Sequence, residues 1–128
     1  YVTAGTPTAT GTVYLVPPTR VVDTRTGLGA QGPVAAGSGV VVTMTGGSIP
    51  SGAHGVFMNL TVTEPSAGGW VAAYPTQASL PLVSNVNFVA GQTVPNLATV
   101  GLANGQATLY DGSGGTVQLV ADIFGYIL

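Results

Sequence analysis

Cysteine and lysine are both absent from this sequence, and charge of either sign is scarce. Without cysteine the chain can form no disulfide, thiol or zinc-finger site. Two arginines are too few to hold many phosphates, so we expect no nucleic-acid partner. The lack of lysine also excludes a polybasic membrane anchor, and no apolar run is long enough for a membrane-spanning helix, so we expect no membrane insertion. We further expect no metal ion and no cofactor.

The scarcity of charge constrains the surface. Charged residues make up 5% of the 128 residues, against about 25% in an ordinary soluble domain. Six charged side chains cannot cover the exterior, which must therefore consist of Thr, Ser, Asn, Gln, Gly and small apolar groups. A formal net charge of −2 gives copies of the chain little electrostatic repulsion. Such a surface suits close packing against other copies or against a neutral polymer.

Short alternating segments, separated by turns, fill the rest of the chain, and no helical periodicity is present. The clearest segment is 54–63, in which apolar residues at the even positions from Val56 alternate with a mixed set at the odd positions. Asn104-Gly105 is typical of a type I′ hairpin. We predict one all-β domain, a single antiparallel β-sandwich of about nine strands with jelly-roll or Greek-key connections. The other strands are expected at 13–16, where Pro17-Pro18 ends the strand, and at 40–45, 70–74, 83–89, 94–102, 106–110 and 116–126.

The first twelve residues, rich in threonine, are predicted to form an extended N-terminal arm before a sandwich domain at 13–128. The arm is either a loosely attached leader or linker, or a strand that adds to the sheet edge of another copy. Because the chain starts with tyrosine rather than methionine, we expect a mature product whose signal peptide has been removed.

Both arginines lie in one stretch, residues 17–27, on either side of Asp23. Arginine presents a planar fork of donors that can bind a carboxylate and several carbonyls at once. We interpret the stretch as a structural clasp in which Arg20 and Arg25 bind Asp23 and, from the end of the chain, Asp122. The alternative is a site for an anionic ligand.

Five phrases occur in order along the chain: Pro-Thr-Arg-Val-Val-Asp-Thr-Arg-Thr-Gly (18–27), Asn-Leu-Thr-Val-Thr (59–63), Ser-Asn-Val-Asn-Phe (84–88), Gly-Gln-Thr-Val-Pro-Asn-Leu-Ala-Thr-Val (91–100) and Asp-Ile-Phe-Gly-Tyr (122–126). Together they resemble an all-β module, marked by an Asp-Thr-Arg motif, that is common in secreted and cell-surface proteins of actinobacteria. The resemblance covers about residues 13–127. It implies an extracellular location and a non-catalytic role, and it supplies no ligand. The chain departs from it in the Ile-Leu after Tyr126 and in the arm 1–12.

Catalysis is not expected, because the residues that it needs are few and scattered. His54, the only histidine, is expected to be exposed at a strand end, and no nucleophile-elbow pattern surrounds any serine. Hydrolysis would need two of the four carboxylates to lie together, but flanking arginines would hold Asp23 ionised. The segment 111–114 is interpreted as a turn rather than a calcium site, since one carboxylate makes a poor calcium site.

Two further groups of residues are candidate sites. Trp70, Tyr74 and Tyr110 could form a flat platform for sugar rings, or they could belong to the core. Four asparagines lie in or beside strands, where asparagine is disfavoured, and we interpret them as a polar network that locks the sandwich, with a sugar-binding groove as the alternative: Asn59, Asn85, Asn87 and Asn96.

Two functions remain open. The first is a self-assembling structural subunit of an extracellular surface or filament, a homo-oligomer or polymer that packs through its nearly uncharged β-surface. The second is a carbohydrate-binding or adhesion module that holds a secreted protein or a cell on a polysaccharide.

Overall fold

The computed structural model describes residues 2–3, 11–81 and 84–128 of the chain. These residues form strands and turns and contain no helix, so none of them forms a helix that could span a membrane. The expectation of an all-β protein is confirmed. The strands are β1 (Val2–Thr3), β2 (Val13–Asp23), β3 (Gly39–Thr43), β4 (Gly55–Thr63), β5 (Gly69–Pro75), β6 (Val86–Phe88), β7 (Val94–Gly101), β8 (Gln106–Asp111) and β9 (Gln118–Ile127).

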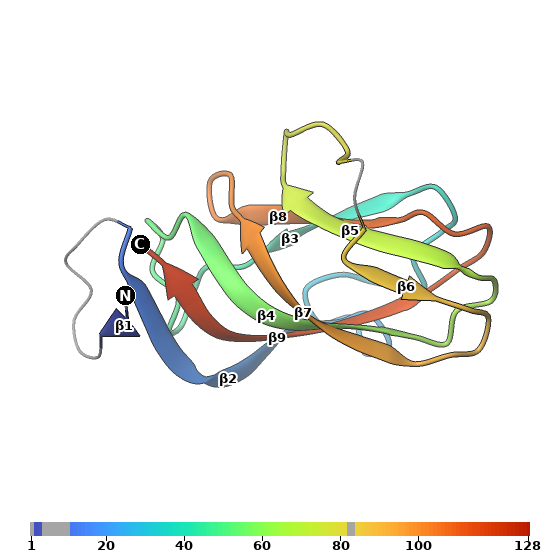
Figure 1. Ribbon diagram of the computed structural model, residues 1–128, viewed down its shortest axis with the longest axis horizontal. Helices are drawn as coiled ribbons and strands as arrows, with labels where there is room; N and C mark the ends of the chain where they lie inside the picture. The colour runs from blue at the N-terminus through green and yellow to red at the C-terminus, as the bar shows by residue number, and fades with distance from the viewer. Residues whose placement is uncertain (1, 4–10, 82–83) are drawn as a thin grey trace.

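Two antiparallel sheets form the body of the protein (Figure 1). The first contains β2, β9, β4 and β7 in that order, and the two-residue β1 adds to the outer edge of β2 in the parallel sense. The second contains β3, β8, β5 and β6. The chain changes sheet at most connections, so strands that pair are often distant in sequence, as β2 and β9 are. We call these the five-stranded and the four-stranded sheet.

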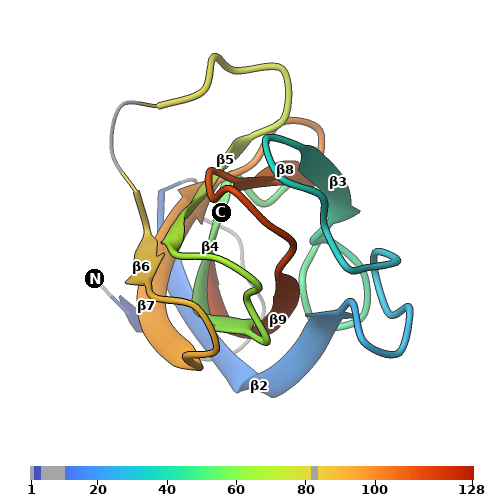
Figure 2. The ribbon, with the colours of Figure 1, turned by 90° about the vertical axis from the view of Figure 1, so that its right-hand side faces the viewer.

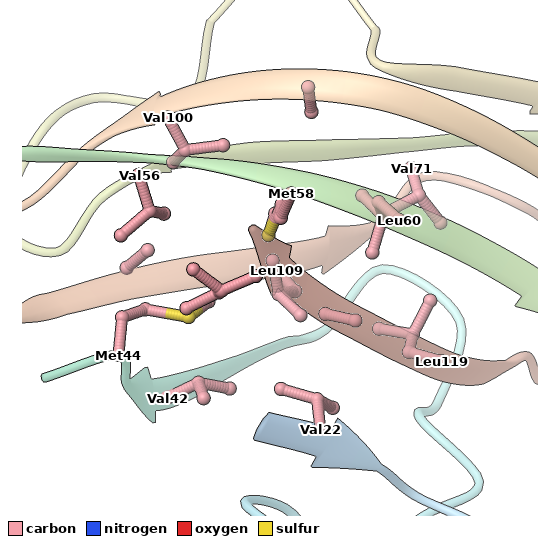
Figure 3. Packing of buried hydrophobic residues seen from close by; sticks show 14 of the residues in the cluster. Val22, Val42, Met44, Val56, Met58, Leu60, Val71, Val100, Leu109 and Leu119 are labelled. Carbon is pink, nitrogen blue, oxygen red and sulfur yellow. The ribbon is translucent and has the colours of Figure 1, made fainter. Parts of the chain in front are cut away.

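The core lies between the two sheets (Figure 3). Alternation in β4 turns its even-numbered residues inward, and Val56, Met58, Leu60 and Val62 are fully buried. Leu109 of β8 packs toward them from the other sheet in Figure 3. The alternation predicted for 54–63 is thus confirmed, because a sheet with one face on the core needs apolar residues at every second position.

The prediction that Pro17-Pro18 ends a strand is wrong, since β2 continues through both prolines to Asp23. The ladder between β2 and β9 runs from the pair Leu15–Gly125 to the pair Thr19–Ile123, so three residues of β2 oppose one of β9. Both prolines lie in this bulge. Proline cannot donate to a ladder, and at a bulge no donor is required. The bulge therefore allows one strand to join segments that the sequence pattern separates.

Other boundaries follow the sequence more closely. Asn104 and Gly105 both have positive φ, of 51° and 76°, and Ala103 bridges Gln106, as the predicted type I′ hairpin requires. The strand expected at 83–89 is shorter, Val86–Phe88, and its first residue lies outside the described part of the chain.

Two residues of the predicted arm are described, and they pair with this chain's own β2, Val2 with Val13 and Thr3 with Tyr14. Residues 1 and 4–10 of the arm lie outside the described residues. At the end of the arm, Thr12 is buried, and its carbonyl accepts a hydrogen bond from the Leu128 N–H. The edge of β2 can therefore accept an extended segment.

Candidate functional site

The structure brings the four clasp residues together on the outer face of the five-stranded sheet. Arg20 donates to both carboxylate oxygens of Asp122, from Nε at 2.8 Å and from Nη2 at 3.3 Å. Arg25 donates to both carboxylate oxygens of Asp23 in the same bidentate way, from Nε to Oδ1 and from Nη2 to Oδ2, with both bonds at 2.9 Å. A longer ion pair of 3.6 Å joins Arg20 to Asp23, so the four charged side chains form one ionic network. Forked pairing of this kind fixes geometry as well as energy.

A second bulge in β2 makes this ionic network possible. Arg20 and Asp23 are three residues apart, and strict alternation would place them on opposite faces. The ladder slips between Arg20 and Val22, so that Arg20 pairs with Asp122 and Asp23 pairs with Val120. Asp122 and Val120 are two residues apart on β9 and share a face. The extra residue therefore turns both Arg20 and Asp23 outward.

The ion pairs shift the titration of their members. Hydrogen bonds from the Arg25 side chain are the main cause that lowers the pKa of Asp23, and they outweigh the opposing effect of desolvation. Hydrogen bonding to Asp122 raises the pKa of Arg20, and hydrogen bonding to Asp23 raises that of Arg25. All these shifts favour the charged forms. Asp23 is nearly buried while both arginines are about half exposed, as expected of a clasp that encloses its carboxylate.

Thr24, between the two clasp residues, points inward, and sequence reasoning did not single it out. Its side chain is 2% exposed, donates to Gln118 Oε1 at 2.6 Å and accepts from the Leu119 N–H at 2.8 Å. Each residue of the Asp-Thr-Arg motif thus has a contact of its own. Alternation could not identify these contacts, because Thr24 lies just after the end of β2 and its partners Gln118 and Leu119 come from β9.

The segment 111–114 holds a buried carboxylate, which sequence reasoning also missed. Asp111 is fully buried at the end of β8, and its Oδ1 accepts from the Ser113 N–H at 2.8 Å and from the Ser113 hydroxyl at 2.6 Å. Its Oδ2 has no hydrogen-bond partner within the described part of the chain. Burial raises the pKa of Asp111 and outweighs the two bonds from Ser113. The segment is a turn stabilised by hydrogen bonds between its own residues.

The remaining side chains that could act in catalysis or metal binding do not form a cluster in the described part of the chain. His54 is exposed, one residue before β4, as expected. Among residues 2–3, 11–81 and 84–128, no group of three His, Cys, Asp or Glu side chains could hold a metal ion.

Three of the four asparagines take part in hydrogen bonds where the two sheets meet at β6 and β7. Asn85 accepts from the Ala73 N–H at 2.7 Å, and Asn96 of β7 donates to the Asn85 carbonyl. Asn87 accepts from the Ser84 hydroxyl at 2.9 Å. Asn59 is not brought to this seam; it lies exposed on β4, opposite Asp122 in the ladder.

The candidate platform lies on the outer face of the four-stranded sheet. Trp70 and Tyr110 are neighbours, with ring centroids 5.7 Å apart and planes at 33°. Tyr74 follows Trp70 on the same side of β5, opposite Thr108 of β8. All three rings are partly exposed, and none belongs to the core cluster. The alternative that they are core residues is therefore wrong.

A second aromatic pair lies on the outer face of the five-stranded sheet. Phe57 and Phe124 have ring centroids 6.3 Å apart and planes at 33°. Leu15 of β2 and Leu97 of β7 are strongly exposed on strands of this sheet, at 61% and 64%. We call Leu15, Phe57, Leu97 and Phe124 the apolar patch.

Compared with known proteins, the chain matches no family model, no curated protein and no solved structure. The resemblance carried by residues 18–27 and the later phrases therefore stays a prediction.

Proposed function

We propose that the protein is a non-catalytic extracellular structural protein, a subunit of a self-assembling surface or filament. The observation that carries the proposal is the placement of charge. Of the six charged side chains, four neutralise one another in the clasp and Asp111 is buried. Glu64 is the sixth, and it lies close enough to Arg25 to raise the pKa of that arginine. The rest of the surface is free of side-chain charge, so little electrostatic repulsion keeps copies apart.

The apolar patch gives the copies a surface to share. Leu15, Phe57, Leu97 and Phe124 come from all four antiparallel strands of the five-stranded sheet. Exposed apolar groups gathered on one face, with polar residues around them, are typical of protein interaction sites. We propose that two copies bury this patch against each other or against a neighbouring face in the assembly.

The arm supplies a second contact. The pairing of Val2–Thr3 with β2 supports the proposal that this edge receives an arm from a neighbouring copy. Exchange of an identical element between copies replaces one set of backbone hydrogen bonds by an equivalent set, so it costs little. An added strand would also cover a sheet edge that is otherwise open.

The finer fold assignment is part of the proposal. We propose a β-sandwich of the jelly-roll type, supported by the strand order β2-β9-β4-β7 in one sheet and β3-β8-β5-β6 in the other. Jelly rolls occur in capsid proteins, which assemble, and in lectins, which bind sugar. This analogy is compatible with either function and assigns neither. The extracellular location is supported only by the resemblance of residues 13–127 to secreted modules.

Electron microscopy of the purified chain tests the proposal. Wild-type protein is expected to form filaments or sheets, and Leu97→Glu is expected to abolish them, because a buried unpaired charge is costly. The matched control is Val41→Glu, which places the same charge at a similarly exposed residue of β3 in the other sheet. Deletion of residues 1–12 should weaken assembly if the arm is exchanged.

A wild-type chain that stays monomeric at high concentration in light scattering would refute assembly. Equal assembly of Leu97→Glu and Val41→Glu would show that the apolar patch is not the contact.

A further inference from the structure

We infer that the outer face of the four-stranded sheet is a binding site for a neutral polysaccharide, whose sugar rings stack on Trp70 and Tyr110. This site lies on the opposite side of the molecule from the apolar patch, and it does not depend on assembly. In Figures 1 and 2 the loop that follows β5 rises beyond this sheet, at the end of β5 away from Trp70.

Trp70 lies against the backbone just after the end of β8. The carbon atoms around the ring fusion of its indole cover Gly112 so closely that a Cβ at that position would overlap them. The Gly112 N–H donates to the Trp70 carbonyl at 2.8 Å, so the two residues are direct neighbours across strands. One face of the ring is therefore covered by backbone, while Trp70 as a whole stays partly exposed. Glycine at 112 is therefore a requirement of the platform.

Tyr110 extends the surface. Its partner across the ladder is Gly39 of β3, where an added Cβ would overlap the Thr108 methyl group and contact the tyrosine ring. Beneath the rings, Ala72 is fully buried although it is not part of the core cluster. The side chains of this outer face must therefore cover it. The two glycines and Ala72 have little or no side chain, so the two rings can lie close to the backbone of the sheet.

Polar groups surround the rings. Asn87 is exposed and stands opposite Trp70 in the ladder, and Thr108 stands opposite Tyr74. Sites for small polar ligands combine apolar or aromatic contact area with a few placed hydrogen-bonding groups. A sugar ring offers the matching surface, an apolar C–H face with hydroxyls at its rim.

Charge selects the class of polymer. Aromatic platforms also stack nucleobases, but single-stranded nucleic acid needs a positively charged groove to hold its backbone. Both arginines of this chain are in the clasp, on the outer face of the other sheet. Uncharged rings flanked by amides and hydroxyls therefore complement an uncharged polysaccharide.

The single tryptophan makes the site its own reporter. Intrinsic fluorescence is titrated with cellohexaose and chitohexaose, and co-sedimentation is measured with microcrystalline cellulose, chitin and insoluble mannan. We expect at least one of these probes to retain the protein and the corresponding oligomer to shift the Trp70 emission.

Variants locate the site. Trp70→Ala and Tyr110→Ala are each expected to weaken retention by roughly tenfold or more. Phe57→Ala is the matched control, because it breaks an aromatic pair of similar geometry on the other outer face. Gly112→Ala keeps every ring but displaces the indole, so it should also reduce retention and change the emission of the unliganded protein.

Thermal melts show that the variants are folded, and fluorescence titration of the wild type needs no variant. Leu97→Glu should still bind, so that failure of assembly and failure of sugar binding are separate results. The inference is overturned if none of the probes retains the wild type, if Trp70→Ala and Phe57→Ala bind equally, or if only polygalacturonate or DNA is retained.

Discussion

The two outer faces of the molecule each carry a half-exposed aromatic pair, but only one carries charge. Phe57 and Phe124 share their face with the ionic clasp, whereas Trp70 and Tyr110 lie on a face without charged side chains. The ring geometries are nearly the same. What differs is the surroundings, so aromatic pairs on a sheet acquire different roles from the groups beside them.

The faces also differ in what the outer side chains cover. On the clasp face Val120 is 5% exposed and lies outside the core cluster, and on the aromatic face Ala72 is equally excluded from both solvent and core. Val120 pairs with Asp23, so clasp residues lie around it. The clasp thus adds a small covered region to a single sheet. Ala72 instead makes room for rings.

The largest effect on stability is expected beneath the clasp, from Thr24→Val. The substitution keeps the shape of the side chain but leaves the Leu119 N–H and Gln118 Oε1 without their partner. An unsatisfied buried polar group costs about 1–3 kcal/mol. Urea unfolding should show this loss. The control, Thr26→Val, removes one hydroxyl bond from an exposed residue and should change stability by about 0.5 kcal/mol or less.

A smaller but diagnostic difference is expected between Arg25→Ala and Trp70→Ala. Loss of Arg25 leaves the nearly buried Asp23 carboxylate with only a backbone bond and the 3.6 Å contact to Arg20. The melting temperature should therefore fall by several degrees while sugar retention is unchanged. Trp70→Ala should instead reduce sugar retention while the melting temperature is unchanged. Arg25→Lys should recover little, because lysine lacks the planar fork. An unchanged melt for Arg25→Ala would exclude the clasp.

The smallest effect is a pair of opposite pH dependences. The lowered pKa of Asp23 means that its contribution is present above the ordinary carboxyl pKa of about 3.9 and is lost as the pH falls through its folded value. The raised pKa of Asp111 means that its contribution is complete below about 3.9 and is lost as the pH rises through its folded value.

Asp111→Asn should accordingly flatten the loss of stability as the pH rises above about 4, and Asp23→Asn should flatten the loss as the pH falls below about 4. Unfolding midpoints measured on both sides of this pH test both. If Asp111→Asn followed the wild-type profile above pH 4, burial of this carboxylate in its charged form would not be the cause.

Local patterns of the sequence predicted a large share of the fold. The alternation at 54–63 and the Asn104-Gly105 turn depend only on neighbouring residues, and both are present in the structure. The continuation of β2 through Pro17-Pro18 could not be predicted, because it depends on a bulge against β9, more than a hundred residues away. The burial of Asp111 was missed because a short Asp-Gly-Ser segment reads as an exposed turn.

The sequence by itself determined the all-β class, the scarcity of surface charge and the grouping of both arginines around Asp23, since these follow from composition and short-range order. Only the tertiary structure decided that Asp122 pairs with Arg20 and Asp23 with Arg25, that Thr24 turns inward and that Trp70 lies on Gly112 outside the core. Each of these contacts joins strands brought together by ladder register, and register is set by the packing of the whole sheet rather than by any one segment.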